Sequence, residues 1–164
     1  MPVYKTNLTD TVGQPDSDVI ISWSDSFSTG IELIDNQHKR LVELTNQLYQ
    51  ACRLGGEALD TAFKDTMSRV VEYVRLHFTT EQEMLKRINY PNYTEHKGEH
   101  DSLIKMVLET TKDYGDRKKF VPNNFVRFLK DWIVGHIAHS DKLYAAYIAN
   151  QKKNGLLSDK DIAG

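Results

Sequence analysis

Apolar side chains recur every three or four positions along most of this chain, the spacing that places them on one face of an α-helix. Four stretches show this period, and each is bounded by residues that commonly start or stop a helix. The expected helices cover residues 35–54, about 58–87, 93 to about 114, and 122 to about 150. Asp35 is the expected N-cap of the first helix, Gly55 and Gly56 end it, and Pro91 separates the second helix from the third.

This pattern predicts an all-α protein. Four amphipathic helices joined by short loops, with no strand pattern of comparable length, favour an antiparallel up-down-up-down four-helix bundle. Residues 1–30 form an N-terminal arm, residues 31–150 the bundle, and residues 151–164 a polar tail that we expect to fray. Residues 19–23 are apolar, and we expect them to pack against the bundle because an exposed apolar patch favours association.

Composition and charge narrow the class of protein. The 164 residues are 40% hydrophobic and 27% charged, as in ordinary globular proteins, and a net charge of -2 gives no electrostatic reason for a nucleic-acid partner. We read no membrane span and no secretory signal, and expect a cytoplasmic protein. The single Cys52 excludes an internal disulfide and Cys-ligated zinc or iron-sulfur sites, and is expected to be a small buried residue.

Polar residues interrupt the otherwise apolar helix faces at six positions: His38, His77, Glu81, His96, His100 and His136. A single histidine on an apolar face is more often a hydrogen-bonded core residue than a metal ligand. Left unsatisfied in the core, however, each of these six groups would cost on the order of 1–3 kcal/mol. Their apolar neighbours offer no hydrogen bonds, so the pattern favours a bound metal.

The spacing of these residues brings them together. His77 and Glu81 are four apart, as are His96 and His100, so each pair lies on one face of its helix. Because antiparallel helices alternate in direction, all six fall within roughly 5–20 Å of the same end of the bundle, at about 1.5 Å per residue. Five imidazoles and a carboxylate exceed the four ligands of a structural zinc site. Two ions that share a carboxylate fit better, and ligand chemistry leaves their identity open.

The same residues resemble the hemerythrin family, from residue 23 to about residue 148. The resemblance is carried by Gly30-Ile31, Ile34-Asp35-Asn36-Gln37-His38-Lys39, the pairs His77-x-x-x-Glu81 and His96-x-x-x-His100, and Trp132-x-x-x-His136-Ile137-x-x-x-Asp141. It implies a centre of two iron ions joined by an oxo or hydroxo bridge. By this resemblance one iron is bound by His96, His100 and His136, the other by His38 and His77, and both by Glu81 and Asp141.

The implied ligand set fills every position of the first iron and leaves one open at the second, where dioxygen binds. The implied function is reversible dioxygen binding for storage, delivery or sensing, by a protein that is not an enzyme. Leu103, Trp132, Ile133 and Ile137 are candidates for an apolar lining of the open position, and equally for ordinary core. The alternatives are a di-iron oxidoreductase that acts on peroxide, nitric oxide or dioxygen, and a sensory module that binds a partner protein.

The last ligand does not follow from regular helix geometry. Asp141 is five residues after His136, about 140° around an α-helix, whereas His139 is three residues after it and closer to the apolar face. Spacing alone favours His139, and the family pattern favours Asp141. We expect Asp141, because a bridging anion offsets the charge of the ions, and a π-bulge between His136 and Asp141 would reconcile the two arguments.

Overall fold

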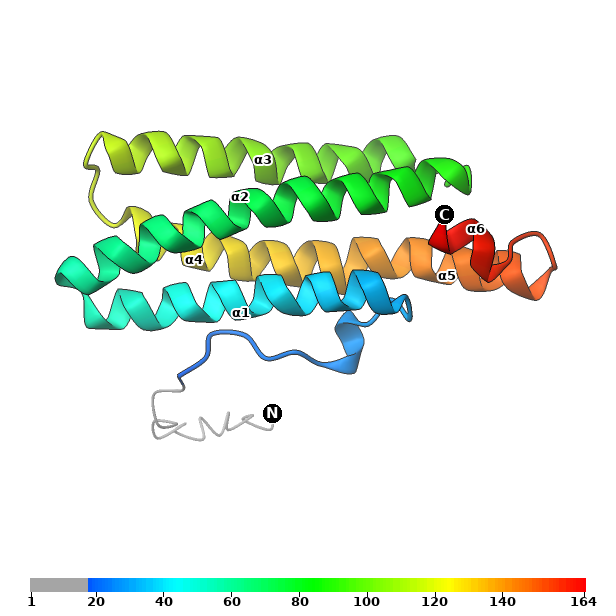
Figure 1. Ribbon diagram of the computed structural model, residues 1–164, viewed down its shortest axis with the longest axis horizontal. Helices are drawn as coiled ribbons and strands as arrows, with labels where there is room; N and C mark the ends of the chain where they lie inside the picture. The colour runs from blue at the N-terminus through cyan, green and yellow to red at the C-terminus, as the bar shows by residue number, and fades with distance from the viewer. Residues whose placement is uncertain (1–17) are drawn as a thin grey trace, which may run out of the picture.

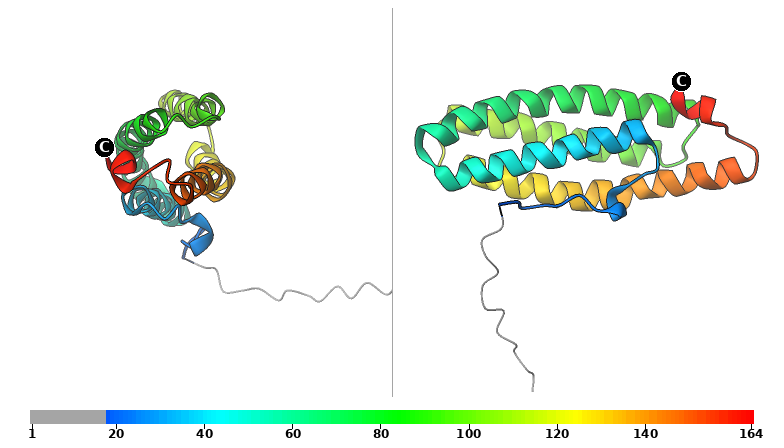
Figure 2. Two further views of the ribbon diagram at one scale, coloured as in Figure 1. Left: turned by 90° about the vertical axis from the view of Figure 1, so that its right-hand side faces the viewer. Right: turned by 60° about the horizontal axis from the view of Figure 1, so that its bottom comes forward.

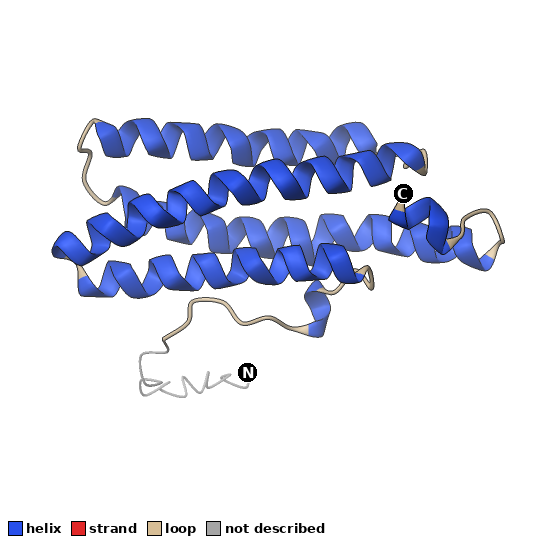
Figure 3. Cartoon of the chain, viewed as in Figure 1, coloured by secondary structure: helices blue, strands red, loops and turns tan. Residues whose placement is uncertain are grey.

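The structure, a computed structural model, describes residues 18–164 and is a bundle of helices (Figure 1). In chain order its elements are the short 3-10 helix η1 (Asp25–Phe27), α1 (Glu32–Leu54), α2 (Gly56–Arg87), α3 (Tyr93–Gly115), α4 (Val121–Trp132), the π-helix η2 (Ile133–Ser140), α5 (Asp141–Lys153) and α6 (Asp159–Ala163). α4, η2 and α5 continue into one another, so the bundle has four long segments. Residues 18–164 contain no strand (Figure 3), and the predicted all-α four-helix bundle is confirmed.

Segments that follow one another in the chain run antiparallel and pack side by side. α1 contacts α2 and α4, α2 contacts α3, and α3 contacts α4, which closes a four-sided bundle. The end-on view shows the four segments around a common axis, with η1 and α6 on the outside (Figure 2). None of the helices in residues 18–164 is long and apolar enough to cross a membrane. Of the predicted arm, residues 1–17 lie outside the described residues.

Two hydrophobic clusters fill the bundle, and a polar layer lies between them. The larger cluster includes Leu41, Leu44, Leu48, Phe63, Val70, Leu103, Phe125, Leu129, Ile133 and Ile137. The second cluster consists of Met84, Leu85, Ile88, Tyr90, Tyr144 and Ile148, with several half-buried neighbours. Along α2, His77 and Glu81 come between Val70 of the larger cluster and Met84 of the second. The predicted metal ligands therefore occupy a layer that is closed by apolar side chains on both sides.

The start of α1 differs from the expectation, and the prediction of Asp35 as its N-cap is wrong. α1 begins at Glu32, and Asp35 lies buried inside its first turn. Its carboxylate accepts hydrogen bonds from the backbone N–H of Thr29 at 2.7 Å and from the hydroxyl of Ser28 at 2.6 Å. Burial alone would raise the pKa of Asp35, but these hydrogen bonds lower it overall. Asp35 thus fixes the loop that leads into the helix rather than capping it.

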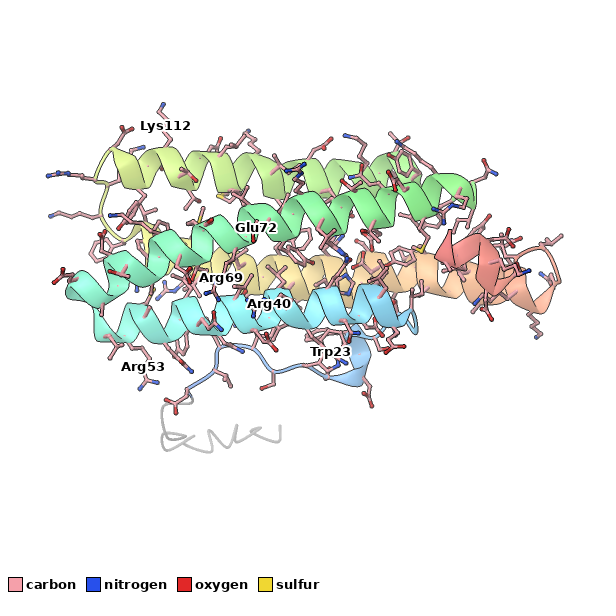
Figure 4. The ribbon with its side chains drawn as sticks, viewed as in Figure 1. Trp23, Arg40, Arg53, Arg69, Glu72 and Lys112 are labelled. Carbon is pink, nitrogen blue, oxygen red and sulfur yellow. The ribbon has the colours of Figure 1, made fainter. Side chains whose placement is uncertain are left out.

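The apolar residues 19–23 pack against the bundle, as predicted. Ile21 is buried in the larger cluster, and Ile20 and Trp23 are half-buried against it. The amide of Asn46 in α1 accepts hydrogen bonds from the backbone N–H of Ile20 and Ile21 and donates one to the carbonyl of Ile21 at 2.8 Å. Figure 4 shows Trp23 beside α1, where Lys39 Nζ lies 5.3 Å from the centre of its ring.

The turn between α1 and α2 is as short as the two glycines predicted. α1 ends at Leu54, and Gly55 follows with a φ of +70°, a conformation that favours glycine. α2 starts at the next residue, Gly56. Cys52, in the last turn of α1, is half-buried rather than buried as expected, and its partial burial raises the pKa of the thiol.

The tail does not fray, so that expectation is wrong. α5 extends to Lys153, and α6 folds back against the end of α2 (Figure 1). Ser158 and Asp161 form a capping box at the start of α6, which satisfies two N–H groups of the helix end. Arg87 of α2 donates to the carbonyl oxygens of Asp161 and Ile162, both at 3.3 Å. The prediction rested on the polar composition of the tail and overlooked Ile162, which packs against the second hydrophobic cluster.

We predict that an Ile162→Ser substitution detaches α6. Removing most of a half-buried aliphatic side chain should lower the free energy of unfolding by about 1–2 kcal/mol, which urea denaturation measures. The amides of α6 should also lose protection from hydrogen exchange. Lys160→Ser, at an exposed position of the same helix, is the matched control. Equal stability of the two variants would show that α6 is not held by this contact.

Candidate metal centre

All seven side chains predicted as ligands converge in the polar layer, and each is between 0 and 3% exposed: His38, His77, Glu81, His96, His100, His136 and Asp141. Among residues 18–164, two groups have donor atoms close enough together to hold a metal ion. One group consists of Glu81, His96, His100 and His136, and the other of His38, His77 and Glu81. Glu81 belongs to both groups, so the arrangement is that of two adjacent metal positions.

The two carboxylates lie between the two groups of imidazoles. Glu81 Oε2 is 3.0 Å from Nε2 of both His96 and His100, and 3.7 Å from Nε2 of His77. Asp141 directs one oxygen toward each group of imidazoles. Its Oδ2 is 3.1 Å from His38 Nε2, and its Oδ1 is 3.1 Å from His136 Nε2. Each carboxylate can therefore bridge two ions.

The donor atoms are spaced as ligands of a common ion. Two ligands about 2.1 Å from one ion and at right angles lie about 3 Å apart. The Nε2 atoms of His100 and His136 are 3.0 Å apart, and those of His38 and His77 are 3.3 Å apart. Apart from these facing imidazole nitrogens, both carboxylate oxygens of Asp141 are buried without a hydrogen-bond partner. Buried polar atoms usually have partners, so these oxygens and the facing imidazole nitrogens fit a pair of cations.

The protonation of the metal-free site also suits cation binding. Burial alone would raise the pKa of Glu81, but the surrounding imidazoles lower it well below its usual range, and His136 has the same effect on Asp141. Burial lowers the pKa of His77 to about 3 and also lowers that of His100. Two ionised carboxylates and two neutral imidazoles are thus present near neutral pH, the forms that metal ligands require.

His136 differs from the other imidazoles. Burial alone would lower its pKa, but the carboxylates of Asp141 and Glu99 outweigh burial and raise the pKa to about 10. Metal-free His136 is therefore protonated near neutral pH. Its positive charge lies between the carboxylates of Asp141 and Glu99 and offsets their negative charge.

A π-helix brings Asp141 into the site. η2 spans Ile133–Ser140, and the N–H of Asp141 donates to the carbonyl oxygen of His136, five residues earlier. In this geometry residues five apart share a face, whereas in an α-helix they diverge. Asp141 is fully buried among the imidazoles, while His139 is exposed. This π-helix is the bulge that reconciles the helical spacing with the family pattern, and His139 is not part of the cluster.

Sequence reasoning missed the residues that support the cluster from outside. Gln37 Oε1 lies 2.9 Å from His77 Nδ1, and Gln82 Nε2 lies 3.1 Å from His100 Nδ1. The remaining contacts are those of Glu99 with His136 Nδ1 and of the Tyr144 hydroxyl, which donates to Glu81 Oε1. Position was one available signal, because Gln37, Gln82 and Glu99 each adjoin a predicted ligand in the sequence, and Gln37 also belongs to the motif that carries the resemblance.

Aromatic rings fix the planes of three imidazoles. Phe78 stacks on His100 with ring centres 3.6 Å apart and an interplanar angle of 2°. Trp132 stacks on His136 at 4.3 Å and 19°. Tyr73 stacks on His77 at 4.9 Å and 18°. These contacts restrict rotation of the imidazoles, so their Nε2 atoms stay directed at the centre of the cluster.

Fold and site together define a four-helix bundle with a paired histidine–carboxylate metal site. The chain matches the family described as Hemerythrin HHE cation binding domain over residues 29–148. It is 35% identical over 128 residues to a bacteriohemerythrin of Clostridium acetobutylicum, which covers 74% of this chain and 96% of that protein. It is 31% identical over 148 residues to a bacteriohemerythrin of Pseudomonas aeruginosa, covering 87% and 90%.

Solved structures agree with the sequence comparisons. A crystal structure of a hemerythrin variant matches with a TM-score of 0.70 and 28% identity, covering 78% of this chain and 96% of that chain. The chain belongs to the hemerythrin family.

We predict that His100→Leu removes metal from the site. The substitution deletes an imidazole from the group that contains Glu81, His96 and His136 and puts no donor in its place. Metal content after loading and desalting should fall by at least one ion per chain, and metal should raise the melting temperature less than in the parent protein. His139→Leu is the control, because that histidine is exposed, and it should keep the full metal content. Unchanged metal in His100→Leu would contradict the assignment.

Proposed function

We propose that this chain binds dioxygen reversibly at a non-haem di-iron centre with an oxo or hydroxo bridge, and that it is not an enzyme. The proposed ligands are His96, His100 and His136 for one iron, His38 and His77 for the other, and Glu81 and Asp141 for both. The observation that carries the proposal is the unequal number of imidazoles, three on one side and two on the other, around two shared carboxylates. If both ions shared the two carboxylates equally, the ion held by His38 and His77 would have fewer protein ligands and could accept dioxygen.

When bound, the iron pair supplies that open coordination position and the electrons that dioxygen binding requires. The chain supplies the surroundings. Leu103, Ile133 and Ile137 are each 0% exposed in the larger cluster, and the half-buried Trp132 stacks on His136. We expect these side chains to keep water and protons away from the site, where they would otherwise favour irreversible oxidation. On the opposite side of the polar layer, Tyr144 holds one oxygen of Glu81 with its hydroxyl.

Several relatives are named bacteriohemerythrin, which supports oxygen binding at a di-iron centre at the level of the family. We infer storage, delivery or sensing of dioxygen as the use of the site.

The proposal is tested by metal analysis and absorption spectroscopy of the same sample. Reduced protein loaded with ferrous iron should contain two irons per chain and be nearly colourless. Air should produce a visible charge-transfer band, and argon or vacuum should remove it over repeated cycles. One metal per chain, or a band that does not reverse, would reject the carrier function. Sustained peroxide or nitric oxide turnover with an electron donor, faster than free iron, would instead support the oxidoreductase alternative.

We predict that Ile133→Thr shortens the lifetime of the reduced, oxygen-binding form. The substitution introduces a hydroxyl at a fully buried position in the helical turn before His136, and a hydroxyl admits water and protons. Repeated oxygenation should lose its reversible band several-fold faster than in the parent protein. Val134→Thr makes a similar change at the next residue, which is 48% exposed, and should leave the rate unchanged. Similar rates for the two variants would show that Ile133 does not protect the site.

A further inference from the structure

The Nδ1 atoms of the clustered histidines, which point away from the metal positions, differ in their hydrogen-bond partners. Nδ1 of His77 and Nδ1 of His100 each face a neutral glutamine amide. Nδ1 of His136 faces the carboxylate of Glu99. Nδ1 of His38 is buried and has no hydrogen-bond partner. The strongest outer contact, that of a carboxylate, therefore belongs to the group with three imidazoles.

Glu99 is fixed by two hydrogen bonds to one segment of the bundle. It lies on α3, between His96 and His100, and reaches across to η2. Its Oε2 is 2.5 Å from His136 Nδ1, and its Oε1 accepts a hydrogen bond from the hydroxyl of Ser140 at 2.9 Å. Both of its partners are buried.

This contact is unlike the surface ion pairs of the same helix. Lys97 and Asp101, four residues apart on α3, pair at 2.6 Å, and both side chains are about half-exposed. Such pairs contribute little to stability. The Glu99 side chain is 44% exposed, but its contact joins two segments and ends on an imidazole that is 2% exposed and directed at the metal cluster. Its geometry is that of a carboxylate–histidine–metal arrangement, in which the carboxylate orients the ligand and increases its basicity.

We propose that Glu99, held by Ser140, is a positioning residue that adds to the inequality of the two metal positions. By accepting the Nδ1–H of His136, Glu99 leaves the Nε2 lone pair directed at the metal and strengthens this imidazole as a donor. The position formed by His96, His100 and His136 then holds its ion more tightly than the position formed by His38 and His77. This inference rests on the two-metal site of the proposed function, but not on its reaction with dioxygen.

The experiment uses zinc, which has no redox chemistry, in place of iron. The full chain is loaded with two zinc ions and mixed with a chromogenic chelator, and zinc release is followed with time. The parent protein should release one ion in a fast phase and one in a slow phase. Glu99→Gln keeps the shape of the side chain but removes its charge, and should accelerate the slow phase roughly 10- to 100-fold while leaving the fast phase unchanged. Ser140→Ala should have a smaller effect in the same direction.

Glu95→Gln is the matched control. It removes the same charge from an exposed position one turn earlier on α3, and should release zinc as the parent protein does. Iron-loaded protein gives a second readout, because loss of the Glu99 charge should raise the reduction potential of one iron more than that of the other. Circular dichroism checks that each variant is folded.

Several outcomes would overturn the proposal. They are a single release phase in the parent protein, a slow phase in Glu99→Gln equal to that in Glu95→Gln, and equal acceleration of both phases, which indicates general loosening. Failure of the iron-loaded parent protein to bind dioxygen reversibly would reject the proposed function alone, since zinc release does not depend on oxygen chemistry. Two unequal zinc phases that respond to Glu99 would still support the unequal positions.

Discussion

The burial of two carboxylates, Glu81 and Asp141, is the constraint on which the rest of this structure depends. Removing an ionised carboxylate from water costs several kcal/mol even after the protein relaxes. Both side chains are 0% exposed and only 3.0–3.1 Å from their closest imidazole nitrogens. Positive charge at this point offsets the cost, whether a proton on His136 or a metal ion supplies it. The bundle is therefore organised around a buried site, at Glu81 and Asp141, where the binding of a cation is strongly favourable.

Each of the four long segments supplies at least one side chain to that site. α1 supplies His38, α2 supplies His77 and Glu81, α3 supplies two histidines, and the fourth segment supplies His136 and Asp141. Bound metal would tie together four segments that otherwise hold one another through apolar packing. The two hydrophobic clusters on either side pack the four segments against one another and so hold the donors close together.

The sequence predicted the bundle and the convergence of the donors because both follow from helical periodicity. It could not decide between His139 and Asp141 from spacing, since that choice depends on a departure from α-helical geometry that only backbone hydrogen bonds reveal. Glu99 was overlooked because its contact with His136 crosses between segments and leaves no periodic signal. The N-cap and tail predictions failed because Asp35 and the residues of α6 act through specific contacts that composition does not report.

The π-helix also divides the fourth segment into two helices with different rotational phase. One additional residue in a turn rotates everything that follows by about 100° relative to an uninterrupted α-helix. With this rotation included, Ile133 and Ile137 lie in the larger cluster, and Tyr144 and Ile148, further along the segment, lie in the second cluster, against which α6 packs. Loss of one residue from this turn would restore a regular helix, yet it would turn Tyr144 and Ile148 away from their partners. The π-helical turn that places Asp141 in the site therefore also determines which side chains pack against α6 at the end of the bundle.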